Sequence, residues 1–250
     1  MLAELEQSNG IGILRLRRPE RANALNTALL KQLERLQRQI RRDRHLRVLI
    51  TLGEGKGFCA GSDVQELAGF SLLQAEKSQL LAAKVCREFL QIPQPTIAGV
   101  HGYALGGGFF LAAYHDFRIV SLDARLGLPE VALGWNPTFG IQRLCQLAGV
   151  GASSRWLMLG SEFSASEAAE SGWTNQVVPE SEVLTACNNL AERLLALPAG
   201  GLTAIKQAMW GVSGGQFTHS DAIEARLFRK CLAFSEAQAS LRTFRRGRTQ

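Results

Sequence analysis

Short apolar runs recur along the chain, and longer stretches of helical periodicity lie between them. Runs of about 4–8 residues that are rich in Ile, Leu and Val are typical of buried strands. We predict strands at residues 11–16, 48–52, 96–100, 117–120 and 175–178. Strands that alternate with helices indicate a mixed α/β fold.

Residues 27–42 have the clearest helical pattern. Their apolar positions recur at steps of three and four, at Leu29, Leu33, Leu36 and Ile40. The same steps place basic side chains on the opposite face, at Lys31, Arg35, Arg38 and Arg42. We interpret this face as solvated, with Glu34 paired to Arg38 one turn later. A cationic surface for RNA is the alternative.

Helical periodicity also covers residues 72–90, and Pro93 and Pro95 predict the end of that helix. From residue 141 onward the pattern is helical, with glycine and proline between short segments. The length of 250 residues accommodates one large domain with a helical appendage. We therefore divide the chain into a core at residues 1–179 and a C-terminal helical region at residues 180–250.

The composition excludes some classes of protein but does not identify the function. Hydrophobic residues make up 46% of the chain, and no apolar run approaches the roughly 20 residues of a membrane span. The acidic N-terminus has no secretory pattern, so we expect a cytoplasmic protein with no membrane partner. The net charge of +6 favours anionic partners, among which coenzyme A and nucleic acid both qualify.

The sequence has no metal or nucleotide motif. The five cysteines are widely spaced with no Cys-x-x-Cys pair, and the four histidines show no ligand spacing. No P-loop pattern occurs, and no Gly-x-Gly-x-x-Gly motif follows a predicted strand. We therefore expect neither a metal site nor a nicotinamide or flavin cofactor.

Glycine-rich turns follow two of the predicted strands. One covers residues 101–108 and leads into an apolar helix, and the other covers residues 57–64. Glycine lets a ligand approach the backbone closely. The first N–H groups of a helix are unpaired, and the helix dipole adds partial positive charge there. Two such turns predict a pair of backbone donors that stabilise a developing oxyanion.

These turns and three further segments resemble the crotonase superfamily, the enoyl-CoA hydratases and isomerases. The five segments extend over nearly the whole chain and lie at residues 18–25, 58–63, 102–108, 128–130 and 142–144. The resemblance implies the α/β crotonase-like (ClpP/crotonase) β-β-α spiral with two roughly perpendicular sheets. It also implies that the C-terminal helices mediate a homotrimer, with trimers often paired into hexamers.

The resemblance further implies a site for an acyl-CoA or acyl-carrier-protein thioester. Its catalytic groups would be the backbone N–H groups of Ser62 and Gly107 and the carboxylate of Glu130. Its substrate-binding residues would be Arg21, Ala22, Ala60, Asp63, Val64, Gln65, Phe110, Trp135 and Thr138. Coenzyme A would enter as part of the substrate, with no separate cofactor.

One position departs from the hydratase pattern and decides the expected reaction. Crotonase hydratases use two glutamates, and this chain has Phe110 at the first position and Glu130 at the second. Phenylalanine cannot transfer a proton, so two-carboxylate activation of water is unavailable. Family isomerases keep only the later glutamate, and we expect an enoyl-CoA isomerase with Glu130 as sole acid/base. An apolar wall of Phe109, Phe110, Trp135 and Phe139 is expected to raise the pKa of Glu130.

Three alternatives remain open. A decarboxylase acting on a β-carboxyacyl thioester, carried by coenzyme A or by a carrier protein, would use the same oxyanion hole. A weak enoyl-CoA hydratase would retain part of the family's activity. A non-catalytic homologue would bind RNA or another partner through the basic face of residues 27–42, although nucleic acid is the partner we favour least.

Overall fold

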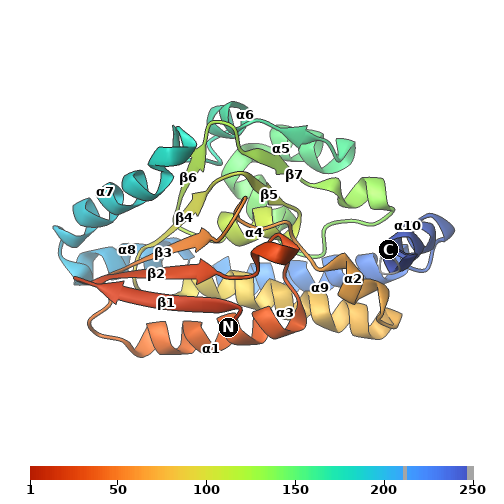
Figure 1. Cartoon of the computed structure of the whole chain (residues 1–250), viewed down its shortest axis with the longest axis horizontal. Coiled ribbons are helices and arrows are strands. Elements are labelled where there is room, and N and C mark those ends of the chain that lie inside the picture. The colour runs from red at the N-terminus through yellow and green to blue at the C-terminus, as the bar shows by residue number, and fades with distance from the viewer. Residues whose placement is uncertain (211–212, 247–250) are drawn as a thin grey trace.

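The computed structural model describes residues 1–210 and 213–246 (Figure 1). Its strands are β1 Ala3–Ser8, β2 Ile11–Leu16, β3 Val48–Gly53, β4 Thr96–Val100, β5 Tyr103–Leu105, β6 Phe117–Ser121, β7 Arg125–Gly127, β8 Glu162–Phe163 and β9 Gln176–Val178. Its α-helices are α1 Thr27–Arg42, α2 Val64–Ala68, α3 Leu72–Gln91, α4 Gly107–Ala113, α5 Ile141–Leu159, α6 Ala165–Glu170, α7 Val183–Leu195, α8 Ala199–Trp210, α9 Ser213–Cys231 and α10 Ser235–Arg246. Short 3-10 turns include η2, Pro129–Leu133.

The strands form two sheets. The larger has the order β1-β2-β3-β4-β6-β9 and is parallel except for the β1–β2 hairpin. The smaller has the order β5-β7-β8. The predicted strands are present, but the hairpin strand β1 and all of the smaller sheet were not predicted. In β1 only Ala3 is buried, so an edge strand with polar residues carries little hydrophobic signal.

Helices cover both faces of the larger sheet, which explains why β3 is buried at every position. Val48, Ile50 and Leu52 pack with α7 on one face. Leu49 belongs to the main core on the other face, which includes the apolar side of α1 and much of α3. Figure 1 shows α7 on one side of the strands and α1 and α3 on the other.

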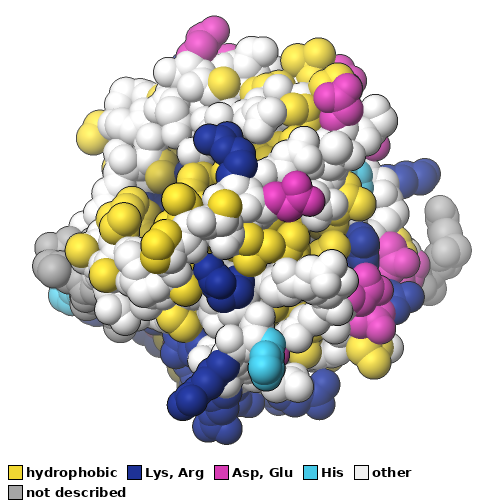
Figure 2. Space-filling model, turned by 90° about the vertical axis from the view of Figure 1, so that its left-hand side faces the viewer, with side chains coloured by type: hydrophobic (Ala, Val, Ile, Leu, Met, Phe, Trp, Pro, Cys, Tyr) yellow, Lys and Arg dark blue, Asp and Glu magenta, His cyan; other side chains and the backbone are white. Residues whose placement is uncertain are grey.

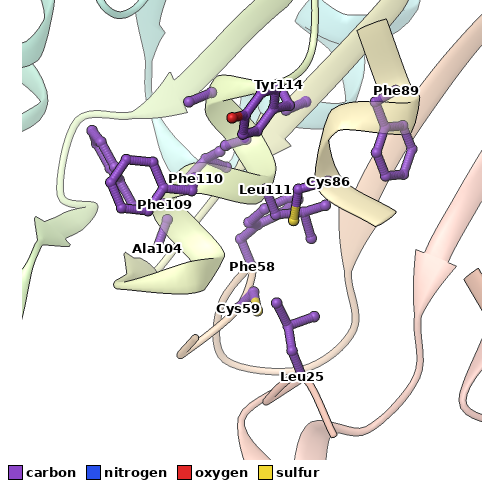
Figure 3. Packing of buried hydrophobic residues seen from close by; sticks show 14 of the residues in the cluster. Leu25, Phe58, Cys59, Cys86, Phe89, Ala104, Phe109, Phe110, Leu111 and Tyr114 are labelled. Atoms are coloured by element: carbon purple, nitrogen blue, oxygen red, sulfur yellow. The ribbon is translucent and has the colours of Figure 1, made fainter. Parts of the chain in front are cut away.

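Helix α4 lies at the centre of the molecule, and every one of its residues is buried. Figure 3 shows its side chains packed among residues of the loop that follows β3 and residues of α3. Phe109 stacks on Trp173 with ring centroids 4.3 Å apart. Because the helix is enclosed by packing, its N-terminus is held rigidly at the end of β5.

The C-terminal helices pack on the same chain. Helix α7 covers the larger sheet, α9 runs along α3, and α10 contacts α2. Phe228 of α9, Leu241 of α10 and Leu232 between these helices join Leu67 and Trp135 in a separate buried cluster. This region therefore helps to enclose the part of the molecule where α2 and η2 meet. Its assignment to trimer formation stays a prediction.

The basic face of α1 is exposed at all four predicted positions. Glu34 pairs with Arg38 at 3.4 Å, as predicted, and also with Lys84 of α3 at 2.6 Å. Figure 2 shows Lys and Arg side chains gathered at its lower edge, the edge along which α1 lies in Figure 1. Within residues 1–210 and 213–246, no helix is both long enough and apolar enough to cross a membrane.

Candidate active site

Two loops bring the backbone N–H groups of Ser62 and Gly107 together. The loop after β3 is tied to β5, because Cys59 bridges Ala104 and its oxygen accepts a 3.0 Å bond from Leu105 N–H. A Cβ built on Gly107 would lie 3.5 Å from the Ser62 nitrogen. Neither N–H donates to another described residue, and Gly107 occupies the first turn of α4. The pair is free to hold one oxygen.

Glycine is needed at two positions beside this pair. A Cβ on Gly61, where φ is +92°, would lie 2.6 Å from the oxygen of Leu105 and 3.1 Å from the nitrogen of Gly107. A Cβ on Gly106, where φ is +49°, would lie 2.7 Å from Oε1 of Glu130. These two glycines therefore allow the donor pair and the carboxylate to approach one another.

Glu130 lies on η2 with its carboxyl group directed at Gly106. Its Oε2 is buried and has no hydrogen-bond partner among the described residues. Burial without a cationic partner disfavours the charged form, and it raises the pKa of Glu130 from 4.5 to about 7. The predicted rise in this pKa is confirmed. A carboxyl group of this kind can both accept and donate a proton near neutral pH.

The donor pair and Glu130 line one partly open cavity of about 70 Å³. A cavity needs about 10–15 Å³ to hold a water molecule, so this one has room for only a few small groups. Glu130 is the sole titratable side chain among the described residues that line it. Helix α9 supplies Phe228, whose ring meets Trp135 edge-on with centroids 6.1 Å apart. A segment of the C-terminal region thus forms one wall of the cavity.

The predicted apolar wall is correct at three positions and wrong at the fourth. Phe110, Trp135 and Phe139 line the cavity, and the Phe110 ring lies 5.7 Å from that of Phe139. Phe109 does not line it, because consecutive helical residues point in different directions and its ring stacks on Trp173 in the core. Figure 3 shows both phenylalanines extending from α4.

The other predicted substrate-binding residues divide into two groups. Ala60, Val64 and Thr138 line the same cavity as the donor pair. Arg21, Asp63 and Gln65 line a separate surface hollow of about 310 Å³, beside α2. Ala22 lies at the end of a short turn, and its oxygen accepts a 3.0 Å bond from Ala60 N–H. Their roles toward a ligand stay predictions.

Two of these outer side chains also have partners within the fold. The Asp63 carboxylate accepts hydrogen bonds from the first turn of α2 and pairs with Arg18 at 2.8 Å. Arg21 donates from Nη1 to Oε1 of Gln65 at 2.7 Å. Asp63 therefore caps the start of α2 whether or not a ligand is bound. Arg21 would have to break its hydrogen bond to Gln65 in order to bind a phosphate group.

Sequence reasoning missed four residues that line the cavity: Leu67, Gln79, Leu133 and Phe228. Gln79 occupies the buried face of α3 together with Ala75, Ala82 and Cys86. A single amide on an otherwise apolar helical face was a detectable signal. Phe228 had no comparable signal. It is far in sequence from the other lining residues, and only the packing of the folded chain places it at the cavity.

The described residues contain no group of three or more His, Cys, Asp or Glu side chains placed to hold a metal ion. All five cysteines are free thiols. The buried His115 hydrogen bonds to the oxygen of Leu111 at 2.9 Å and to Thr51 Oγ1 at 2.8 Å, and burial lowers its pKa to about 3. It is a neutral packing residue of the core, separate from the cavity.

The fold and the site define a class: a β-β-α spiral with two backbone donors and a buried carboxylate at one cavity. The family model for enoyl-CoA hydratase/isomerase matches residues 6–249. The chain is 31% identical to the short-chain-enoyl-CoA hydratase of Clostridium acetobutylicum, covering 96% of this chain and 93% of that protein. It is 34% identical to the crotonyl-CoA hydratase of Syntrophomonas wolfei, with the same coverage.

Solved structures agree with these relatives. The crystal structure of an enoyl-CoA hydratase from Bacillus anthracis superposes with a TM-score of 0.82 at 31% identity, covering 100% of this chain and 98% of that chain. This protein therefore belongs to the enoyl-CoA hydratase/isomerase family of enzymes and has the crotonase fold.

Proposed function

We propose that the protein is an enoyl-CoA isomerase that moves a double bond between the β,γ and α,β positions of an acyl-CoA thioester. The observation that carries this proposal is that Glu130 is the sole titratable group among the described residues lining the cavity. A double-bond shift needs one group that removes a proton and returns it elsewhere. Hydration in the two-glutamate manner needs two, and Phe110 occupies the other position.

The proposed reaction begins when the thioester oxygen accepts hydrogen bonds from the N–H groups of Ser62 and Gly107. The ionised Glu130 then removes a proton from the α carbon, and negative charge moves onto the oxygen held by this pair. Each such donor typically contributes about 3 kcal/mol to lowering the barrier. Glu130, now protonated, returns the proton to the γ carbon, so that no atom is gained or lost.

The pKa of Glu130 supports both halves of this cycle. With a pKa of about 7, the carboxylate is partly ionised at neutral pH and its conjugate acid is not too weak to return the proton. The apolar side chains of Phe110 and Trp135 limit water at the same place. Coenzyme A would enter as part of the substrate, and the proton transfer requires no separate cofactor.

The test incubates the protein with 3-enoyl-CoA or 2-enoyl-CoA, separates the two isomers by chromatography and reads the mass of each product by mass spectrometry. We expect interconversion with no gain of mass in ordinary water, reduced at least about 100-fold by Glu130→Gln. The matched control is Glu162→Gln, which removes an exposed carboxylate that pairs with Arg125 at 2.5 Å away from the cavity. Addition of water at a rate comparable with isomerisation would refute the proposal.

Slow hydration is the second candidate, and the hydratase names of the relatives favour it. In that reaction Glu130 alone would activate the water. Decarboxylation has less support, because no Lys, Arg or His lies among the described residues that line the cavity to receive a substrate carboxylate. A homotrimer or a hexamer remains part of the proposal, on the strength of the family.

A further inference from the structure

A buried side-chain amide lines the cavity in addition to the carboxyl group of Glu130. Gln79 of α3 is only 4% exposed, yet it lines the cavity together with the donor pair. Its Oε1 accepts hydrogen bonds from Thr138 Oγ1 at 2.8 Å and from Ser62 Oγ at 3.2 Å. These two bonds fix the side chain between the loop that contains Ser62 and the loop that follows η2.

These two hydrogen bonds use the oxygen end of the amide. Both hydroxyl protons are satisfied when Oε1 is the shared acceptor. In the structure Oε1 receives both of these bonds, and neither hydroxyl donates to any other described residue. The Nε2 group is therefore the end left toward the cavity, and it donates to no described residue. Two N–H groups stay available for a ligand.

We propose that Gln79 is a specificity-determining residue that hydrogen bonds an uncharged oxygen on the acyl chain of the substrate. The substrate class is a 3-enoyl thioester with a keto, hydroxyl or amide oxygen beyond the double bond. An amide N–H left unpaired in a buried site is unfavourable, so a pure hydrocarbon chain binds less well than one that supplies an acceptor. This inference rests on the proposed thioester site at Ser62 and Gly107.

The surroundings determine that the oxygen is uncharged. No cationic side chain lies among the described residues lining the cavity, and Glu130 contributes negative charge when ionised. A carboxylate on the substrate would be desolvated and repelled there.

The test measures binding, so it does not depend on turnover. The probes are 5-oxohexanoyl-CoA and 5-methylhexanoyl-CoA, which have the same number of heavy atoms and no double bond to shift. We expect the oxo compound to bind the wild-type protein about tenfold more tightly by calorimetry. Gln79→Met is expected to remove this preference, and Gln79→Glu, which keeps the acceptor for both hydroxyls, is expected to reverse it.

The matched control is Gln74→Glu, the same chemical change at an exposed position in the first turn of α3. It should retain the wild-type preference. Circular dichroism establishes that each variant is folded before its affinities are compared. Equal affinities of the wild-type protein for the two probes would overturn the assignment of Gln79, even if isomerisation is observed. A preference that depends on Gln79 would stand even if the protein isomerises nothing.

Discussion

Replacing Glu130 by glutamine is expected to stabilise the folded protein at pH 8. The folded-state pKa of about 7 lies above the unfolded value of 4.5, so the folded protein binds this proton more tightly than the unfolded chain does. The resulting stability is complete below pH 4.5 and is lost as the pH rises through 7. The difference corresponds to about 3 kcal/mol. Glutamine cannot ionise, and it keeps this stability at every pH.

The free energy of unfolding in urea, measured for both proteins at pH 5 and pH 8, tests this reasoning. The variant should be more stable by about 3 kcal/mol at pH 8 and by less than about 1 kcal/mol at pH 5. Glu162→Gln should show no comparable gain, because that carboxylate is exposed and its pKa is lowered by Arg125. An equal gain at both pH values, or none at pH 8, would show that Glu130 is not a desolvated acid.

Four further outcomes are expected. The kcat/KM for isomerisation should rise with pH through about 7 and fall about tenfold per unit below about pH 6, because the ionised Glu130 is the base; a flat profile would argue against it. Gly106→Ala places a Cβ 2.7 Å from Oε1 of Glu130 at a φ of +49°, so kcat should fall about 100-fold while KM changes little. Phe110→Glu should introduce water addition, seen as a gain in product mass, with a lower Tm because Phe110 is 1% exposed. A variant with alanine at the four basic positions of α1, Lys31, Arg35, Arg38 and Arg42, should isomerise at the wild-type rate. If the wild-type protein retains RNA on a filter, this variant should not.

Much of the fold was predictable because its strands are buried on both faces. Residues 48–52 and 96–100 form continuous apolar runs, and the structure places both inside the parallel sheet. Strand β1 was missed because it lies at the edge of the sheet with one face toward solvent. The short strands β5, β7 and β8 were missed because two or three residues are too few to show a period.

The candidate site was predictable where a glycine or a carboxylate is required by chemistry. The turns that contain Ser62 and Gly107 were identified from small residues after strands, and the structure brings their nitrogens to the same cavity. Gln79 and Phe228 were not predicted, because α3 and α9 reach the cavity only through tertiary packing. The environment of Glu130 likewise depends on which rings surround it, and this is why Phe109 was wrongly included.

The phenylalanine at position 110 and the raised pKa of Glu130 both reflect a cavity lining that has no second charged group. A second carboxylate in this cavity would repel the first and would raise at least one of the two pKa values further. Enzymes that keep such a pair need polar surroundings or a bound water to hold the charges. Here Phe110 fills that space, and the remaining polar lining groups, Ser62, Gln79 and Thr138, are uncharged. This lining supports the proposal that the protein moves one proton within a bound substrate, since the cavity accommodates a single charge at a time.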